Sequence, residues 1–200
     1  MAGNLCVVVP KKATKYNHKW SDIIKNWKFR NEKHEEYEEV WHYPNRRLSS
    51  LHEQLSLPVQ IDGRRQGRNE KVTVWFFMDT SGSCVHLKDK FFQCADTFPI
   101  DKFDLRCFCF DTRVYDISLK ERKLYGFGGT RFDIIETRIQ EVMAKEKKKY
   151  PEVVFIFTDG YGNAVNPQKP ENWYWFLDDS NYKGCIPSKS IVYNLADFEQ

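Results

Sequence analysis

Apolar runs separated by amphipathic stretches make up the chain from residue 71 onward. Residues 72–78 (VTVWFFM) and 153–157 (VVFIF) contain no charged side chain, which is typical of strands that are buried on both faces of a sheet. The other predicted strands are residues 103–110, 112–117 (a short edge strand that turns back beside the previous one), 173–177 and 190–195.

Helical spacing of apolar residues is found between these strands. Residues 84–97 alternate apolar and charged positions near a helical period, and residues 131–149 place Ile135, Ile139 and Val142 on one side. The Lys-rich last turn of the second stretch suits a helix C-terminus, and Pro151 ends it. Strands separated by helices of this length predict an α/β fold with a Rossmann-like, doubly wound, mostly parallel sheet.

The first third of the chain has a different pattern. Residues 20–40 contain a helical stretch that residues 43–48 interrupt, and residues 55–69 read as an extended segment followed by a polar, glycine-spaced linker. We therefore predict a short helical N-terminal extension with its linker over residues 1–70 and an α/β domain over residues 71–200.

Composition narrows the class of protein. A hydrophobic content of 41% and an aromatic content of 16% over 200 residues predict a packed globular fold. A net charge of +3 is too small to indicate nucleic-acid binding by itself. The six cysteines show no CxxC pair, which favours free thiols in a reducing compartment. We find no membrane-spanning run and no signal peptide, and we expect a cytoplasmic protein.

Oxygen-bearing side chains follow two of the buried strands. Residues 79–83 (DTSGS) place a carboxylate and two hydroxyls at alternate positions after the first strand, and Asp159 ends the strand at 153–157. A glycine-rich turn at residues 126–130 (GFGGT) delivers Thr130 just before a predicted helix. Because the carboxyl ends of parallel strands form the ligand crevice of such a sheet, these segments are expected to converge. Their hard oxygens suit Mg²⁺ or Mn²⁺ better than zinc.

The order DTSGS, GGT and TDG resembles the metal-ion-dependent adhesion site of a von Willebrand factor type A (VWA) domain over residues 70–200. The resemblance implies that Ser81, Ser83 and Thr130 are direct hydroxyl ligands of Mg²⁺ or Mn²⁺. It also implies that Asp79 and Asp159 bind the ion directly or through water. A further implication is a non-enzymatic module that grips an acidic residue of a protein partner. Intracellular proteins of this kind are often paired with MoxR-type AAA+ ATPases as adaptors.

The segment before the α/β domain resembles a connector in bacterial and phage proteins that carry an upstream zincin-like metallopeptidase domain. Residues 43–48 and Leu57-Pro58 carry this resemblance. The zinc motif HExxH is incomplete here, because His34 is followed by Glu38 where the second histidine should stand. Protease activity is therefore not expected from this chain.

A metal-dependent phosphoesterase or nuclease of Rossmann-like fold is the competing interpretation. Aspartyl phosphotransferases need a second carboxylate two residues after the nucleophile, and Ser81 occupies that position after Asp79. The basic positions at 46–47 and 64–68 could contact phosphates, but acidic residues are interleaved upstream. We therefore favour metal-dependent protein binding over catalysis and do not expect nucleic-acid binding.

Overall fold

The computed structural model describes residues 6–8, 18–31, 40–42, 59–61, 71–178 and 184–195. Two compact units are defined by their contacts. One consists of Met1–Asn31 with Lys71–Gln200, and the other of Glu32–Glu70. In the second unit, β2 (Val40–His42) pairs antiparallel with β3 (Val59–Ile61). The connector predicted at residues 43–48 and the incomplete zinc motif at His34 lie outside the described residues.

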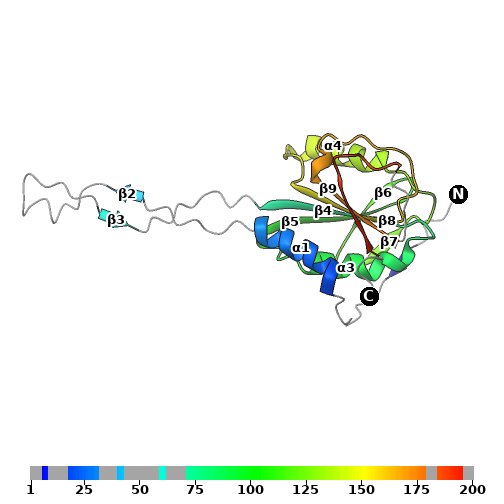
Figure 1. The fold of residues 1–200 in the computed structure, drawn as a ribbon, viewed down its shortest axis with the longest axis horizontal. Helices are drawn as coiled ribbons and strands as arrows, with labels where there is room; N and C mark the ends of the chain where they lie inside the picture. Colours follow the sequence, from blue (N-terminus) through cyan, green and yellow to red (C-terminus); the bar gives the residue numbers. More distant parts are fainter. Residues whose placement is uncertain are drawn as a thin grey trace, which may run out of the picture. The chain divides into compact units, whose positions relative to one another are not determined.

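A six-stranded mixed sheet forms the centre of the larger unit (Figure 1). Its strand order is β10-β9-β8-β4-β5-β6, and all neighbours are parallel except the pair β5 and β6. The strands are β4 (Val72–Asp79), β5 (Phe103–Phe110), β6 (Val114–Ile117), β8 (Val153–Thr158), β9 (Trp173–Leu177) and β10 (Ile191–Asn194). The predicted α/β sheet of mostly parallel strands, including the antiparallel edge strand β6, is therefore confirmed.

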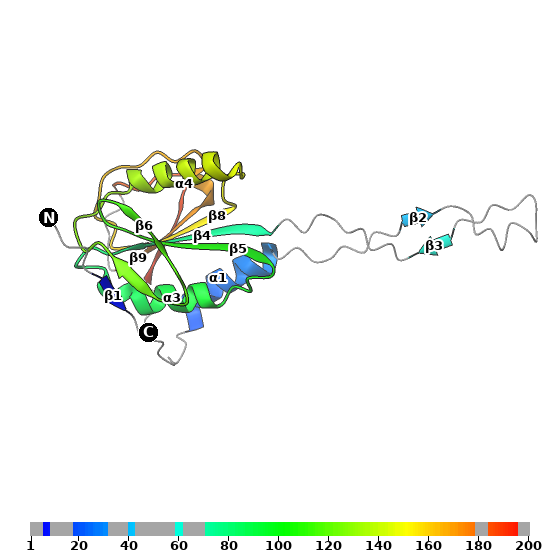
Figure 2. The ribbon, with the colours of Figure 1, turned by 180° about the vertical axis from the view of Figure 1, so that it is seen from behind.

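Helices cover both faces of this sheet, as the two opposite views show (Figures 1 and 2). On one face, α1 (His18–Asn31) and α3 (Lys88–Asp96) contribute Ile24, Trp27 and Phe91 to a buried cluster. On the other face, α4 (Asp133–Glu146) contributes Ile135 and Ile139 to a second cluster. Burial of these side chains on both faces explains why the runs 72–78 of β4 and 153–157 of β8 contain no charged residue.

The helix predicted over residues 84–97 is divided in the structure. A 3₁₀ turn, η1 (Val85–Leu87), comes first, and α3 follows it. Cys84 donates its N–H to the carbonyl of Ser81 at 2.9 Å, and Leu87 donates to Cys84 at 2.9 Å, so the chain closes tight i to i+3 turns before α-helical bonds begin. Hydrophobic periodicity does not distinguish this turn from the first turn of an α-helix.

Several short elements complete the described chain. β1 (Cys6–Val8) pairs antiparallel with β7 (Lys123–Tyr125), and η2 (Pro170–Asn172) leads into β9. The cysteines at 84, 94, 107, 109 and 185 are free thiols, and all but Cys185 are buried. Across the described ranges, none of the helices has the length and apolarity that a bilayer span requires.

Candidate metal centre

The centre lies where the middle strand of the sheet ends. β4 runs between β5 and β8, and its last residue, Asp79, pairs with Phe110 while Met78 pairs with Phe157. The ends of the three strands therefore lie at one edge of the sheet. Asp79 and Thr80 are both fully buried there. The hydroxyl of Thr80 lies 3.0 Å from the carbonyl oxygen of Phe110 and 2.9 Å from that of Tyr125. This side chain therefore stabilises the end of β4 and is not part of the centre.

The carboxylate of Asp79 is held by groups from three separate segments. Ser81 donates its backbone N–H to Oδ1 at 2.9 Å, and the hydroxyl of Thr158 donates to Oδ2 at 2.7 Å. The hydroxyl of Thr130 lies 3.2 Å from each carboxylate oxygen. The glycine-rich turn at 126–130 therefore reaches the end of β4, as the sequence predicts.

A second set of contacts joins the two serines to Asp159. The Oγ atoms of Ser81 and Ser83 are 3.3 Å apart, and Ser83 donates its hydroxyl to Oδ2 of Asp159 at 2.5 Å. The N–H of Tyr161 donates to Oδ1 of Asp159 at 3.0 Å. The backbone N–H of Ser81 links this set to Asp79. The structure thus brings the five sequence-predicted residues, Asp79, Ser81, Ser83, Thr130 and Asp159, into one continuous hydrogen-bonded network.

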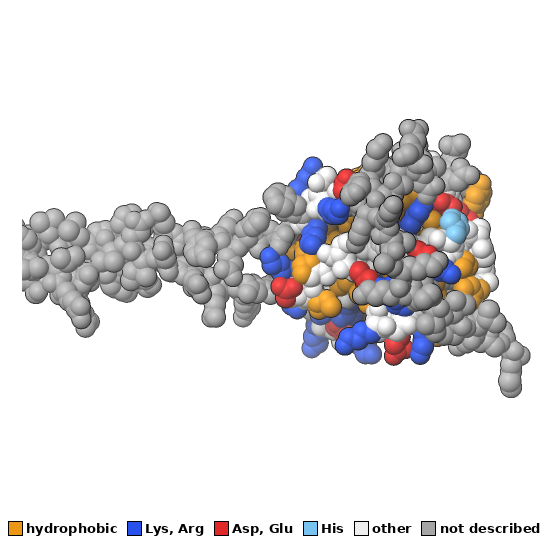
Figure 3. Space-filling view, turned by 90° about the horizontal axis from the view of Figure 1, so that it is seen from below, with side chains coloured by type: hydrophobic (Ala, Val, Ile, Leu, Met, Phe, Trp, Pro, Cys, Tyr) orange, Lys and Arg blue, Asp and Glu red, His pale blue; other side chains and the backbone are white. Residues whose placement is uncertain are grey.

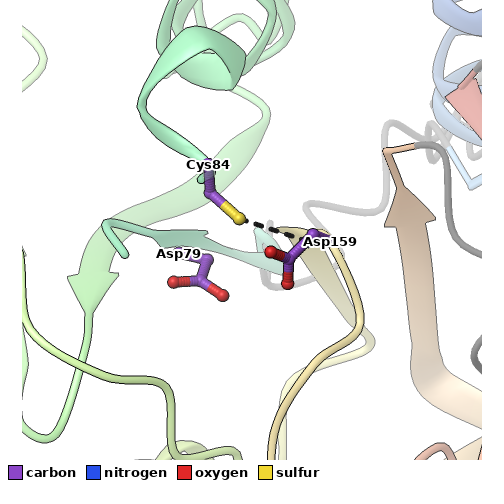
Figure 4. Close-up of side chains that lie close together, drawn as sticks. All are labelled: Asp79, Cys84 and Asp159. Carbon is purple, nitrogen blue, oxygen red and sulfur yellow. Dashed lines mark hydrogen bonds between the residues drawn. The ribbon is translucent and has the colours of Figure 1, made fainter. Parts of the chain in front are cut away.

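Burial is graded across this network. Asp79 is fully buried and Ser81 is 8% exposed, whereas Thr130 and Asp159 are half-buried and Ser83 is exposed. A cation held by these oxygens would be anchored on the buried carboxylate and open to solvent on the side of Ser83. Figure 4 shows how Asp79 and Asp159 approach each other from the ends of β4 and β8.

A second buried carboxylate, Asp111, holds the turn that carries Thr130. Asp111 follows β5 and is 6% exposed. Its Oδ1 accepts the N–H of Arg113 at 2.8 Å, and its Oδ2 accepts the N–H of Gly128 at 3.2 Å. Its backbone carbonyl accepts the N–H of Arg131 at 2.9 Å. Asp111 is therefore bonded on both sides of Thr130 and fixes the position of that hydroxyl.

One glycine of this turn, Gly126, is required by the close approach of Asp111. Gly126 has a φ of +103°, and a Cβ there would lie 2.7 Å from Oδ2 of Asp111. Phe127 also takes a left-handed backbone conformation, with a φ of +78°. Such a conformation is unfavourable for an aromatic residue, and it is tolerated where the surrounding contacts determine the backbone.

The electrostatics of the centre favour a cation. Burial raises the pKa of Asp79, and the negative charge of Asp159 raises it further, although hydrogen bonds from Ser81 and Thr158 oppose these effects. The ion pairs of Arg106, Arg122, Arg131 and Lys148 are formed with other carboxylates. A divalent ion would neutralise both carboxylates, so the donor set of two carboxylates and three hydroxyls fits a hard ion such as Mg²⁺ or Mn²⁺.

Three contributors were not identified from the sequence. Thr158 precedes the expected Asp159 and appeared to be the last residue of a buried strand. Asp111 follows a strand and resembles an ordinary turn residue. Cys84 is fully buried, and its sulfur, together with one oxygen each of Asp79 and Asp159, forms a group of ligand atoms that all lie within 4.8 Å of one another. Burial and the charge of Asp79 raise the pKa of the Cys84 thiol to about 12.

Two further polar residues lie at the strand ends outside this network. His86 in η1 contacts Asp178, which follows β9, with 2.5 Å between Nε2 and Oδ2. Asp178 also donates its backbone N–H to the carbonyl of Thr158 at 3.0 Å. Neither residue was predicted to bind the metal, and in the structure they pair with each other.

Comparison with models of known protein families gave no match, and comparison with curated proteins gave no significant relative.

Proposed function

We propose that the α/β unit is a VWA-like domain that binds Mg²⁺ or Mn²⁺ and acts as a non-enzymatic protein-binding module. The observation that carries the proposal is the convergence of residues 79–83, the turn at 126–130 and residues 158–159 at one edge of the sheet. Ser83 and Asp159, for example, are 76 residues apart in the chain and yet are hydrogen-bonded. In this proposal Ser81, Ser83 and Thr130 supply hydroxyl ligands, and Asp79 and Asp159 bind the ion directly or through water.

The distribution of charge and exposure suits recognition. The two carboxylates balance the charge of a divalent ion, but where they bind through water the direct ligands are neutral hydroxyls, and the ion can still accept a further anionic oxygen. The exposed Ser83 marks the side from which such an oxygen could approach. The incoming group in this proposal is an Asp or Glu side chain of a protein partner, which completes the coordination of the ion.

The partner and the compartment come from the resemblance of the site motif to intracellular VWA domains. On that basis the partner is a MoxR-type AAA+ ATPase, or a protein that the module delivers to one, in the cytoplasm. Nucleic acid is not favoured as a ligand. On the face shown in Figure 3, Lys and Arg side chains have Asp and Glu among them and form no continuous basic surface over the part of the chain that is coloured.

The proposal is tested by titrating the metal-free protein with Mg²⁺ and Mn²⁺ in a calorimeter. Capped peptides that contain a single Glu or Asp, or the matched Gln or Asn, are then added. We expect metal uptake, and we expect the acidic peptides alone to bind, in a manner that EDTA reverses. Thr130→Ala should abolish peptide binding without unfolding the protein. Thr137→Ala, which removes an exposed hydroxyl on α4, should have no effect and serves as the matched control.

Two outcomes would contradict the proposal. One is the absence of Mg²⁺ or Mn²⁺ uptake at millimolar concentration with acidic peptide present. The other is metal-dependent phosphoester hydrolysis that disappears in Asp79→Asn, since that result would assign the centre to a phosphoesterase or nuclease.

A further inference from the structure

The thiol of Cys84 lies among the oxygen ligands of the proposed centre. Its Sγ accepts the backbone N–H of Asp159 at 3.3 Å and lies 3.8 Å from Oγ of Ser83. Figure 4 shows the Cys84 side chain directed from the turn after β4 toward the loop that carries Asp159. The side chain is fully buried, yet its sulfur and the two carboxylates could contact a common ion.

We infer that this centre has a second coordination mode, in which Cys84, Asp79 and Asp159 hold a thiophilic d-block ion such as Zn²⁺. This inference rests on the proposed metal centre and extends it to a different class of ion. Hydroxyl oxygens suit Mg²⁺ and Mn²⁺, whereas a sulfur ligand favours zinc and related ions. The site therefore has two overlapping sets of ligands, one with hydroxyl oxygens and one with the sulfur of Cys84. Asp79 and Asp159 belong to both sets.

The spacing of the three ligand atoms is close to what zinc requires. Bond lengths of about 2.3 Å to sulfur and about 2.0–2.2 Å to a carboxylate oxygen place tetrahedral ligands about 3.3–3.8 Å apart. The observed atoms lie within 4.8 Å of one another, so a closure of about 1 Å suffices. Asp159 is half-buried at a loop and can supply that movement.

The hydrogen bond to the sulfur also suits a bound metal. The N–H of Asp159 already donates to Sγ, and it would continue to do so after binding, which is how outer contacts orient a metal ligand. On binding, the S–H bond is broken, its proton is released to solvent and the sulfur lone pair forms the bond to zinc. No oxidant or reductant takes part.

Occupation by zinc has a consequence for the proposed binding function. A thiolate and two carboxylates together carry more negative charge than a divalent ion neutralises. The zinc-loaded centre therefore carries a net negative charge and repels an acidic side chain, whereas the magnesium-loaded centre, whose thiol stays protonated, has its two carboxylates balanced by the ion and can admit one. Zinc would accordingly act as an inhibitor of peptide capture that competes with Mg²⁺ for the shared carboxylates.

Cobalt titration of the metal-free 200-residue chain tests this coordination, because a Co²⁺–thiolate bond produces a near-ultraviolet charge-transfer absorption. We expect this absorption to appear, zinc to displace it, and Cys84→Ser and Cys84→Ala to abolish it. Both variants should weaken zinc binding by about tenfold or more, a larger loss than the one they cause in Mg²⁺ binding. Cys94→Ala removes a buried thiol from the same chain and should leave the absorption unchanged.

The outcomes separate this inference from the proposed function. Absence of the charge-transfer absorption, or its persistence in both Cys84 variants, would overturn the thiol mode while Mg²⁺-dependent peptide binding could still be intact. Failure of every ion to bind would overturn the proposed metal centre as well. Circular dichroism of each variant establishes that a lost signal comes from a folded protein.

Discussion

Two buried aspartates end adjacent strands of the same sheet but have different surroundings. Asp79 closes β4 and Asp111 follows β5, and Phe110, the residue before Asp111, is paired with Asp79. The carboxylate of Asp111 accepts backbone N–H groups from Arg113 and Gly128. The carboxylate of Asp79 accepts one backbone N–H and contacts two hydroxyls, and it lies near Asp159.

The difference between these surroundings separates a structural carboxylate from a ligand. Backbone N–H groups are fixed donors, so those at Asp111 satisfy its charge in the absence of any ion. Hydroxyls are both donors and acceptors, and those around Asp79 can turn their lone pairs toward a cation. The same side chain therefore fixes a turn at one strand end and forms a candidate metal centre at the next.

The largest effect is expected when each aspartate is replaced by asparagine, because the two changes should move stability in opposite directions. Asp79→Asn removes a buried charge that faces Asp159, and the metal-free protein should melt about 2–4 °C higher, which corresponds to ~1 kcal/mol. Its Mg²⁺ affinity should fall by more than about 100-fold. Asp111→Asn places a side-chain N–H opposite one of the backbone N–H groups that the carboxylate now accepts. This change should lower the free energy of unfolding by about 1–3 kcal/mol. Calorimetric melting with EDTA and Mg²⁺ titration measure both quantities.

A lower melting temperature of metal-free Asp79→Asn would contradict the proposal that this carboxylate is destabilising until a cation binds. An unchanged melting temperature in Asp111→Asn would likewise show that its two backbone contacts are not needed to hold the turn.

A smaller effect is expected from a double-mutant cycle between Asp111 and Thr130. Asp111→Ala should weaken Mg²⁺ binding by about tenfold, the scale seen for groups that orient a metal ligand. Because Asp111 acts through the position of the Thr130 hydroxyl, this loss should largely disappear when Thr130 is already alanine. The measurement is Mg²⁺ affinity in the four proteins of the cycle. Fully additive losses would show that Asp111 affects the centre by some route other than Thr130.

The smallest effect is expected from pH. The native pKa of Asp79 is raised above 3.8, mainly by burial, so the native state holds this proton more tightly than the unfolded state. The stability of the metal-free protein should therefore decrease as pH rises from 3.8 through the raised native pKa. Urea unfolding of the parent protein and Asp79→Asn, compared over this range, isolates the contribution. A difference between the two proteins that does not change with pH would contradict the assignment.

The parts of the fold that depend on local pattern were predictable from the sequence. The apolar runs of β4 and β8 were recognised because both faces of these strands are buried. The DTSGS, GGT and TDG segments indicated the five residues of the centre. The three-residue strands β1 and β7 were missed, since a strand of that length has no periodicity to detect.

The missing parts of the site depend on contacts between distant segments. Asp111 contacts Gly128 across 17 residues, and Cys84 contacts Asp159 across 75 residues. Nothing in the local sequence around Asp111 or Cys84 distinguishes a turn aspartate or a buried thiol from a residue of the site. Trp27 was placed on a helix by its spacing, but its packing against Phe155 of β8 required the tertiary structure.

The parallel pairing of β4 with β8 also has a kinetic consequence. The two strands are joined by a long crossover that includes α3, β5, β6, β7 and α4, so they come together only after much of the chain has been ordered. Such non-local pairing is a slow event in folding. Asp79 and Asp159 come together only when β4 has paired with β8. Cation uptake during refolding should therefore occur with the final slow phase, and its rate should report completion of the fold.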